Sequence, residues 1–201
     1  MNFERPAIMA HIELEEGLPG IIGLLEYRKD TAKPIRELTQ ILLRGESTLT
    51  VGERELIATI VSHRNECTFC ATAHQTTADQ LLGNSDTSAH VCRDLATAPV
   101  SEKMKGLLAI ASKVQQSGLS VRAEDVEKAR TAGATDREIH DTVLIAALFC
   151  LYNRYVDGLG TWTPEGPDFY ASLADRLTTR GYVRPEKGYD DHKYGGKPNE
   201  S

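Results

Sequence analysis

Apolar residues recur at helical spacing along almost the whole chain, and this pattern restricts the fold more than any other feature. Between residues 35 and 42, for example, Ile35, Leu38, Ile41 and Leu42 fall on one helical face. No stretch alternates apolar and polar residues for long enough to predict a strand. We therefore expect a compact all-α domain, with helices over Gly20–Asp30, Pro34–Arg44, 50–64, Cys67–Leu82, Ser88–Leu95, Ser101–Gln116, Arg122–Ala132, 135–158 and Asp168–Leu177.

Helix start and stop signals support these boundaries. Thr50 is followed three residues later by Glu53, which fits a capping box at a helix N-terminus. Thr135 and Glu138 form a second such pair. Gly83 follows the last apolar residue of its helix and is a suitable stop, because glycine adopts the left-handed conformation that ends many helices.

Length, charge and hydropathy exclude several classes of protein. The 201 residues suit one domain, and the net charge of −6 with no basic stripe argues against a nucleic-acid partner. No basic segment followed by an apolar stretch opens the chain, so no signal peptide is expected. The longest apolar run, Val143–Tyr152, has ten residues, whereas a membrane span needs about 20. We expect a cytoplasmic protein that does not enter a membrane.

The run Val143–Tyr152 is apolar on every side of its helix, which predicts burial all round. Such a helix is either central in its own domain or shared with another subunit, and a mixture of both predicts a homo-oligomer. Residues 1–184 are expected to form one helical domain. Residues 185–201, rich in Gly, Lys, Asp and Pro, are expected to form a polar C-terminal tail that is either disordered or lies on a neighbouring subunit.

The chemically informative motif is Cys67-Thr68-Phe69-Cys70-Ala71-Thr72-Ala73-His74, which Glu55 precedes by twelve residues. Four cysteines are too few for a disulfide scaffold, and a C-x-x-C in a reducing compartment indicates redox activity or metal binding. On a helix, Cys67, Cys70 and His74 share one stripe. Cys67 lies near the helix start, where free amides and the helix dipole favour a thiolate.

Glu55 can be placed by the register of a helical hairpin. If the chain turns tightly around Arg64 and Asn65, positions whose numbers sum to about 129 lie level, and 55 and 74 meet this condition. Glu55 would then accept a hydrogen bond from His74. Such a bond fixes the His74 tautomer and raises its basicity, so that the imidazole can take a proton from Cys70.

The pattern E-x11-C-x-x-C-x-x-x-H resembles the alkyl hydroperoxidase D family within the carboxymuconolactone decarboxylase-like superfamily. Further segments resemble its peroxidase-related branch, so that the likeness covers roughly residues 15–165: Pro19-Gly20-Ile21, Leu42-Leu43-Arg44-Gly45, residues 52–58 and residues 153–160. The resemblance implies an all-helical fold, trimers or hexamers, and cofactor-free reduction of a small peroxide by a cysteine pair that a thiol reductant resets.

The resemblance also assigns roles to the four motif residues. Glu55 and His74 would relay protons while Cys67 and Cys70 cycle between dithiol and disulfide. At the position before the second cysteine, where known members often carry His, this chain has Phe69, which cannot relay a proton. Cys70 is favoured as the attacking thiol because His74 lies one turn away. Cys67, nearer the helix terminus, is the alternative.

Two other functions compete with the peroxidase. Cys67, Cys70 and His74 could hold a structural zinc ion, with His63, His90 or Cys92 as the fourth ligand, in a helical oligomer without turnover. Lactone decarboxylation, the other chemistry of the superfamily, needs proton transfer and not a thiol pair. Outside the motif, Cys92 and Cys150 are expected to be inert buried thiols.

Overall fold

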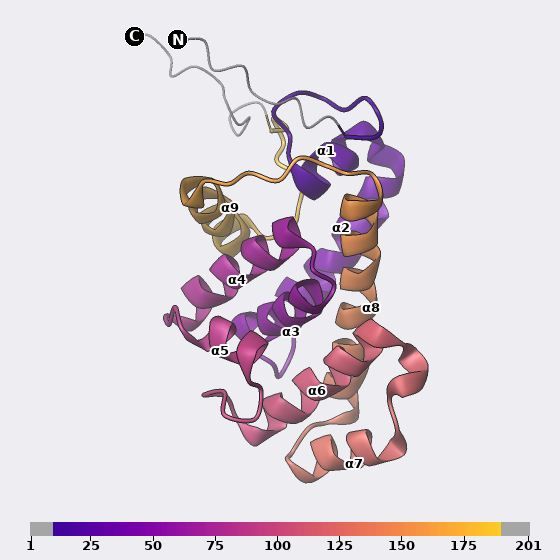
Figure 1. The fold of residues 1–201 in the computed structure, drawn as a ribbon, viewed down its shortest axis with the longest axis vertical. Helices are drawn as coiled ribbons and strands as arrows, with labels where there is room; N and C mark the ends of the chain where they lie inside the picture. Colours follow the sequence, from indigo (N-terminus) through magenta and orange to yellow (C-terminus); the bar gives the residue numbers. More distant parts are fainter. Residues whose placement is uncertain (1–9, 190–201) are drawn as a thin grey trace.

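The computed structural model describes residues 10–189. Within that range it contains no strand, and the expected all-α fold is confirmed (Figure 1). The α-helices are α1 (Gly20–Tyr27), α2 (Lys29–Arg44), α3 (Val51–Arg64), α4 (Thr68–Leu82), α5 (Thr87–Arg93), α6 (Glu102–Gln116), α7 (Ala123–Thr131), α8 (Asp136–Gly158) and α9 (Pro167–Arg180). A short 3₁₀ turn, η1 (Gly118–Ser120), lies between α6 and α7.

The predicted helix caps are confirmed. The Thr50 hydroxyl accepts the Glu53 N–H at 3.2 Å, and the Glu53 carboxylate accepts the Thr50 N–H at 2.8 Å. Thr135 and Glu138 repeat this reciprocal arrangement at the start of α8. Gly83 ends α4 with a φ of +66°. The two N-terminal caps, at Thr50 and Thr135, satisfy backbone N–H donors that would otherwise lack partners in the first turn of each helix.

The boundary between the first two helices differs from the sequence prediction. We expected one helix to reach Asp30 and the next to begin at Pro34, but α1 ends at Tyr27 and α2 begins at Lys29. The break falls at Arg28, and Pro34 lies inside α2. A proline in the second turn forfeits only one backbone hydrogen bond, and tertiary packing of the amphipathic α2 offsets that loss.

Helices α3 and α4 form a tight hairpin in the middle of the molecule (Figure 1). Only Asn65, Glu66 and Cys67 connect them, because Glu66 adopts a left-handed conformation with φ of +59°. That conformation is uncommon for a residue other than glycine. The short connection satisfies the condition on which the register prediction rested.

A second hydrophobic cluster surrounds the cysteines and is distinct from the main core around α3, α6 and α8. It is built from α1, the start of α4, the end of α8 and α9, and Cys67 and Cys70 belong to it. Phe69 is buried there against Phe169 and Tyr170. Its ring also lies directly beneath Gly20, where a Cβ atom would approach within 2.4 Å of it. Phe69 therefore anchors α1 to α4.

Helix α8 is buried along one side only within the single chain, so the predicted burial of its other side against another subunit stays a prediction. Ile145 and Phe149 face the core, but Val143 is 36% exposed and Leu151 is 46% exposed. Ala147 is also exposed, and the three residues form an apolar stripe along one side of the helix. No helix within residues 10–189 is long and apolar enough to cross a membrane.

After α9 the chain turns at Gly181 and returns across the molecule toward α2. The Tyr182 N–H donates to the side-chain oxygen of Gln40 on α2 at 2.7 Å. Part of the predicted polar tail packs closely, since Tyr189 is only 4% exposed. Residues 190–201 of that tail lie outside the described range. The division at residue 184 stays a prediction.

Candidate active site

Glu55 on α3 is the centre of a buried polar cluster. Its side chain is fully buried and accepts three hydrogen bonds or ion pairs from three different segments. His74 Nδ1 on α4 lies 2.7 Å from Glu55 Oε2. Arg44 Nη2 at the end of α2 and the Tyr182 hydroxyl both lie 2.6 Å from Oε1. The predicted contact between Glu55 and His74 is thus confirmed.

These partners keep the Glu55 carboxylate charged despite its burial. Burial, the largest influence, acts to raise the pKa of Glu55, but the attraction of His74 and Arg44 and the hydrogen bond from Tyr182 outweigh it. The net pKa of Glu55 is lowered. The same burial, together with the neighbouring carboxylate, raises the pKa of Tyr182 well above its ordinary value. Tyr182 therefore serves as a neutral donor.

The ionised carboxylate also decides the state of the His74 ring. A carboxylate can only accept, so Nδ1 carries the proton that points at Glu55. In the neutral imidazole, Nε2 then keeps the free lone pair and can act as a base. The ring is held from two sides: it meets Phe149 edge-on at a centroid distance of 4.5 Å and stacks on Tyr182 at 6.1 Å.

The two motif cysteines are unpaired, buried thiols. Cys67 is the N-cap residue of α4 and is 0% exposed, while Cys70 in the first turn is 3% exposed. The neighbouring Cys67 side chain, followed by burial, raises the pKa of Cys70 well above its ordinary value, against the lowering effect of Asn153.

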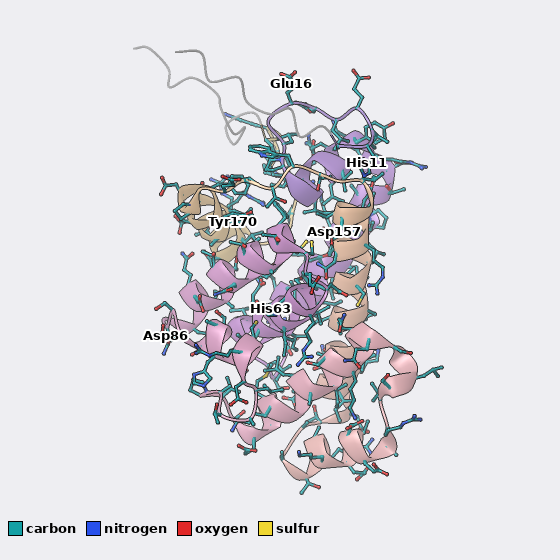
Figure 2. The ribbon with its side chains drawn as sticks, viewed as in Figure 1. His11, Glu16, His63, Asp86, Asp157 and Tyr170 are labelled. Atoms are coloured by element: carbon teal, nitrogen blue, oxygen red, sulfur yellow. The ribbon has the colours of Figure 1, made fainter. Side chains whose placement is uncertain are left out.

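Asn153 on α8 fixes the hairpin turn against the thiols. Its amide group donates to the Ser62 hydroxyl at 3.1 Å and also reaches Cys70. Its carbonyl oxygen accepts from the side chain of Asn65 at 2.8 Å. Asp157, one turn further along α8, is exposed and raises the Cys70 pKa slightly through its charge (Figure 2). Of this pair, Asn153 alone is part of the buried site.

A small cavity of about 60 Å³ opens onto Cys70 and His74. Its walls are mostly apolar, and Cys67 is not among the lining residues. The full lining is Ile21, Ile22, Leu25, Arg36, Phe69, Cys70, Ala73, His74, Phe149, Tyr152, Leu173, Arg176, Leu177, Tyr182 and Tyr189. The open space at Cys70 and His74 admits only a few atoms, such as a water molecule or the peroxide group of a substrate.

The remaining sequence candidates lie apart from this cavity. His63 is exposed on α3 (Figure 2), and His90 bonds to the Thr97 hydroxyl. Burial raises the pKa of Cys92 to about 11, which agrees with an inert thiol. Cys150 is only half-buried and accepts a weak hydrogen bond from Asn65. Within residues 10–189, no group of three His, Cys, Asp or Glu side chains is placed to hold a metal ion. The zinc alternative therefore finds no ligand set in this range.

Sequence reasoning missed three members of the site. Arg44 appeared only within a segment of family resemblance, because its burial beside a carboxylate is visible only in the structure. Asn153 appeared only at the start of the segment 153–160 that resembles the peroxidase-related branch. Tyr182 lies 127 residues from Glu55, and no sequence pattern connects the two positions.

The fold of this chain is similar to the folds of known protein structures. No family model matches the chain, and no curated protein matches it either. Among solved structures, an uncharacterized peroxidase-related protein from Silicibacter sp. TM1040 aligns with a TM-score of 0.68 and 25% identity over 73% of this chain and 77% of that chain. An uncharacterized peroxidase-related protein with an alkylhydroperoxidase AhpD core, from Ralstonia eutropha JMP134, aligns with a TM-score of 0.69 and 25% identity, over 78% and 80%. The resemblance to the alkyl hydroperoxidase D-like, peroxidase-related branch is confirmed.

Arg44→Met should destabilise the protein by about 3 to 5 kcal/mol, because removing one partner of a buried pair leaves the Glu55 charge poorly compensated. Urea unfolding followed by circular dichroism measures this change. Arg28→Met is the matched control, since Arg28 pairs with Asp30 on the surface and its removal should cost less than about 0.5 kcal/mol. Equal effects of the two variants would contradict the central role of the Glu55 cluster.

Proposed function

We propose that this chain is a cysteine-dependent peroxidase that uses Cys67, Cys70, His74 and Glu55. Its fold is similar to that of AhpD-like, peroxidase-related proteins. One observation carries the proposal. Cys70, whose neighbouring thiol Cys67 is one turn away, lines a small and mostly apolar cavity, and the imidazole of His74 in the same lining is backed by a buried carboxylate. A thiol, a base and a positioning group within one site are the equipment for nucleophilic thiol chemistry.

Cys70 is the thiol that attacks the peroxide. It lines the cavity together with His74, whereas Cys67 is fully buried behind it and is absent from the lining. A peroxide in the cavity can therefore reach only the Cys70 sulfur. Cys67, one helical turn before Cys70 at the start of α4, then resolves the product of that attack.

The reaction is a two-electron reduction of the peroxide. The Cys70 thiolate attacks the O–O bond and forms a sulfenic acid, and the departing alkoxide or hydroxide takes up a proton to become an alcohol or water. The Cys67 thiol then attacks the sulfenic sulfur, which forms a disulfide and releases water. A dithiol reductant returns the two electrons by thiol–disulfide exchange.

His74 and Glu55 move the protons that these steps require. His74 Nε2 takes the Cys70 proton and later returns a proton to the leaving oxygen. Glu55 stays ionised, accepts the Nδ1–H and stabilises the imidazolium while it exists. Arg44 and Tyr182 hold Glu55 in place. Phe69 takes no part in this relay, because its ring serves in packing. A cytoplasmic location, where thiol reductants keep the pair reduced, suits this cycle.

Cys70→Ser should abolish peroxide consumption with excess dithiothreitol. Assayed without dithiothreitol, Cys67→Ser should consume about one equivalent of peroxide per chain and keep the sulfenic acid on Cys70, because no Cys67 thiol is present to resolve it. Peroxide loss and trapping of the sulfenic acid with dimedone, located by mass spectrometry, measure these outcomes. Cys92→Ser is the control and should turn over as the wild type does.

Bound zinc should be determined on the same samples. A wild type that consumes no peroxide and carries about one zinc per chain would make the motif a metal site and end the redox proposal. Sulfenic acid on Cys67 instead of Cys70 would reverse the two assigned roles.

The raised pKa of Cys70 predicts a strong pH dependence. The thiolate is the reactive form and its fraction grows tenfold per pH unit below the pKa, so alkylation of Cys70 by iodoacetamide should accelerate throughout pH 7 to 9 without a plateau. Cys67→Ala removes the largest cause of the raised pKa, and its profile should shift to lower pH. Peptide mapping separates Cys70 from the other thiols. A plateau below pH 8 in the wild type would contradict this reading.

The apolar stripe on α8 is proposed as the contact with further copies of this chain in a trimer or hexamer. Val143, Ala147 and Leu151 face outward side by side, and covering such a stripe removes apolar area from water. A second copy offers the same apolar face and can pack against it helix on helix.

Leu151→Glu should lower the molar mass in solution, measured by size-exclusion chromatography with light scattering. The charge would have to be buried without a partner in the assembly, which is unfavourable. Leu119→Glu, at an 85% exposed leucine in η1, is the matched control and should keep the wild-type mass. A monomeric wild type would refute the proposed contact.

A further inference from the structure

Two arginines line the same cavity as Cys70, and the proposed proton relay uses neither of them. Arg36 comes from α2 and Arg176 from α9. Arg36 is only 8% exposed. Cationic side chains are rarely buried without a partner for their charge, because removing that charge from water is costly.

The guanidinium of Arg36 is incompletely satisfied. Its Nη1 donates to the Tyr189 hydroxyl at 2.5 Å, and its Nη2 donates to Glu26 at 3.1 Å. Its buried Nε has no hydrogen-bond partner. Glu26 is shared, since it also binds Arg184 at 2.7 Å, so one carboxylate serves two guanidinium groups.

The charge of Arg176 is less well compensated than the charge of Arg36. No carboxylate within residues 10–189 lies at salt-bridge distance from it, and its guanidinium packs over the Tyr189 ring at 5.3 Å. Arg36 packs over the same ring at 5.4 Å. Tyr189 thus lies between the two cations. Burial, the largest influence, lowers the pKa of Arg176, and the charge of Arg36 acts in the same direction, whereas Tyr189 acts to raise it.

We propose that Arg36 and Arg176 form an anion-binding subsite of the cysteine cavity, which receives the carboxylate of an organic hydroperoxide and which the Tyr189 hydroxyl fills in this structure. This inference rests on the proposed peroxidase function. A carboxylate matches the planar donor groups of arginine, and it would satisfy the free Nε–H of Arg36. The apolar walls formed by Ile22, Leu25 and Leu173 suit a short hydrocarbon chain between the carboxylate and the peroxide.

A neighbouring groove gives such a substrate a route to the subsite. The groove has a volume of about 650 Å³ and lies between α2 and residues 183–184. Leu25 and Arg36 line both the groove and the cavity, so they form the boundary between them. Lys29 and Lys33 also line the groove and favour an anion, although Glu37 is present as well. An acid in the groove reaches the cavity by displacing the Tyr189 hydroxyl from Arg36.

The first test compares a hydroperoxide of hexanoic acid with its methyl ester as substrates of the full chain. We expect kcat/KM to be about tenfold higher for the acid. Arg176→Gln should remove this preference by lowering kcat/KM for the acid about tenfold more than kcat/KM for the ester. Arg180→Gln, at an exposed arginine on the same helix, should retain the preference. Equal kcat/KM for acid and ester in the wild type, or equal losses for both in Arg176→Gln, would overturn the subsite.

The second test does not depend on turnover. Binding of hexanoate to the reduced protein, measured by calorimetry, should weaken about tenfold in Arg176→Gln and strengthen in Tyr189→Phe, which keeps the ring but removes the competing hydroxyl. Hexanoate binding without consumption of any peroxide would refute the proposed function and leave the subsite standing. Peroxide turnover without hexanoate binding would refute the subsite and leave the peroxidase standing.

Discussion

The buried carboxylate of Glu55 is the constraint on which the rest of the site depends. A charge removed from water must find donors inside the protein, and here they come from α2, α4 and the segment after α9. Satisfying Glu55 therefore holds Arg44, His74 and Tyr182 in one place. The same interactions that stabilise the charge also fix the tautomer of His74, so that stability and the proposed catalysis share one arrangement.

The thiols lie where this polar cluster meets an apolar one. Cys70 is shielded enough that the neighbouring Cys67 side chain and burial raise its pKa, yet it opens onto the cavity. A protonated thiol beside a base with a free lone pair is inactive until a proton is transferred. The need for proton transfer agrees with the position of His74 and Cys70 on consecutive turns of α4, where both line the cavity. Asn153 supports the Cys70 sulfur from α8.

The segment after α9 completes the site from the far end of the chain. Tyr182 donates to Glu55, and seven residues later Tyr189 fills the space between Arg36 and Arg176. One short stretch thus touches both the proposed proton relay and the proposed anion subsite. A substrate that displaces Tyr189 would act on the same segment that carries Tyr182. Access to the cavity is thereby linked to how well the proposed proton relay is ordered.

The sequence by itself determined the all-α fold, the capped helices α3 and α8, and the meeting of Glu55 with His74, because helix periodicity and a three-residue turn fix which positions lie level. Local patterns of this kind fail where the interaction is long-range. The break at Arg28, the exposed stripe of α8, and the roles of Arg44 and Tyr182 follow from how whole helices pack. Only the tertiary structure decided that Cys70 lines the cavity while Cys67 does not, because the walls of the cavity come from other helices and not from the motif.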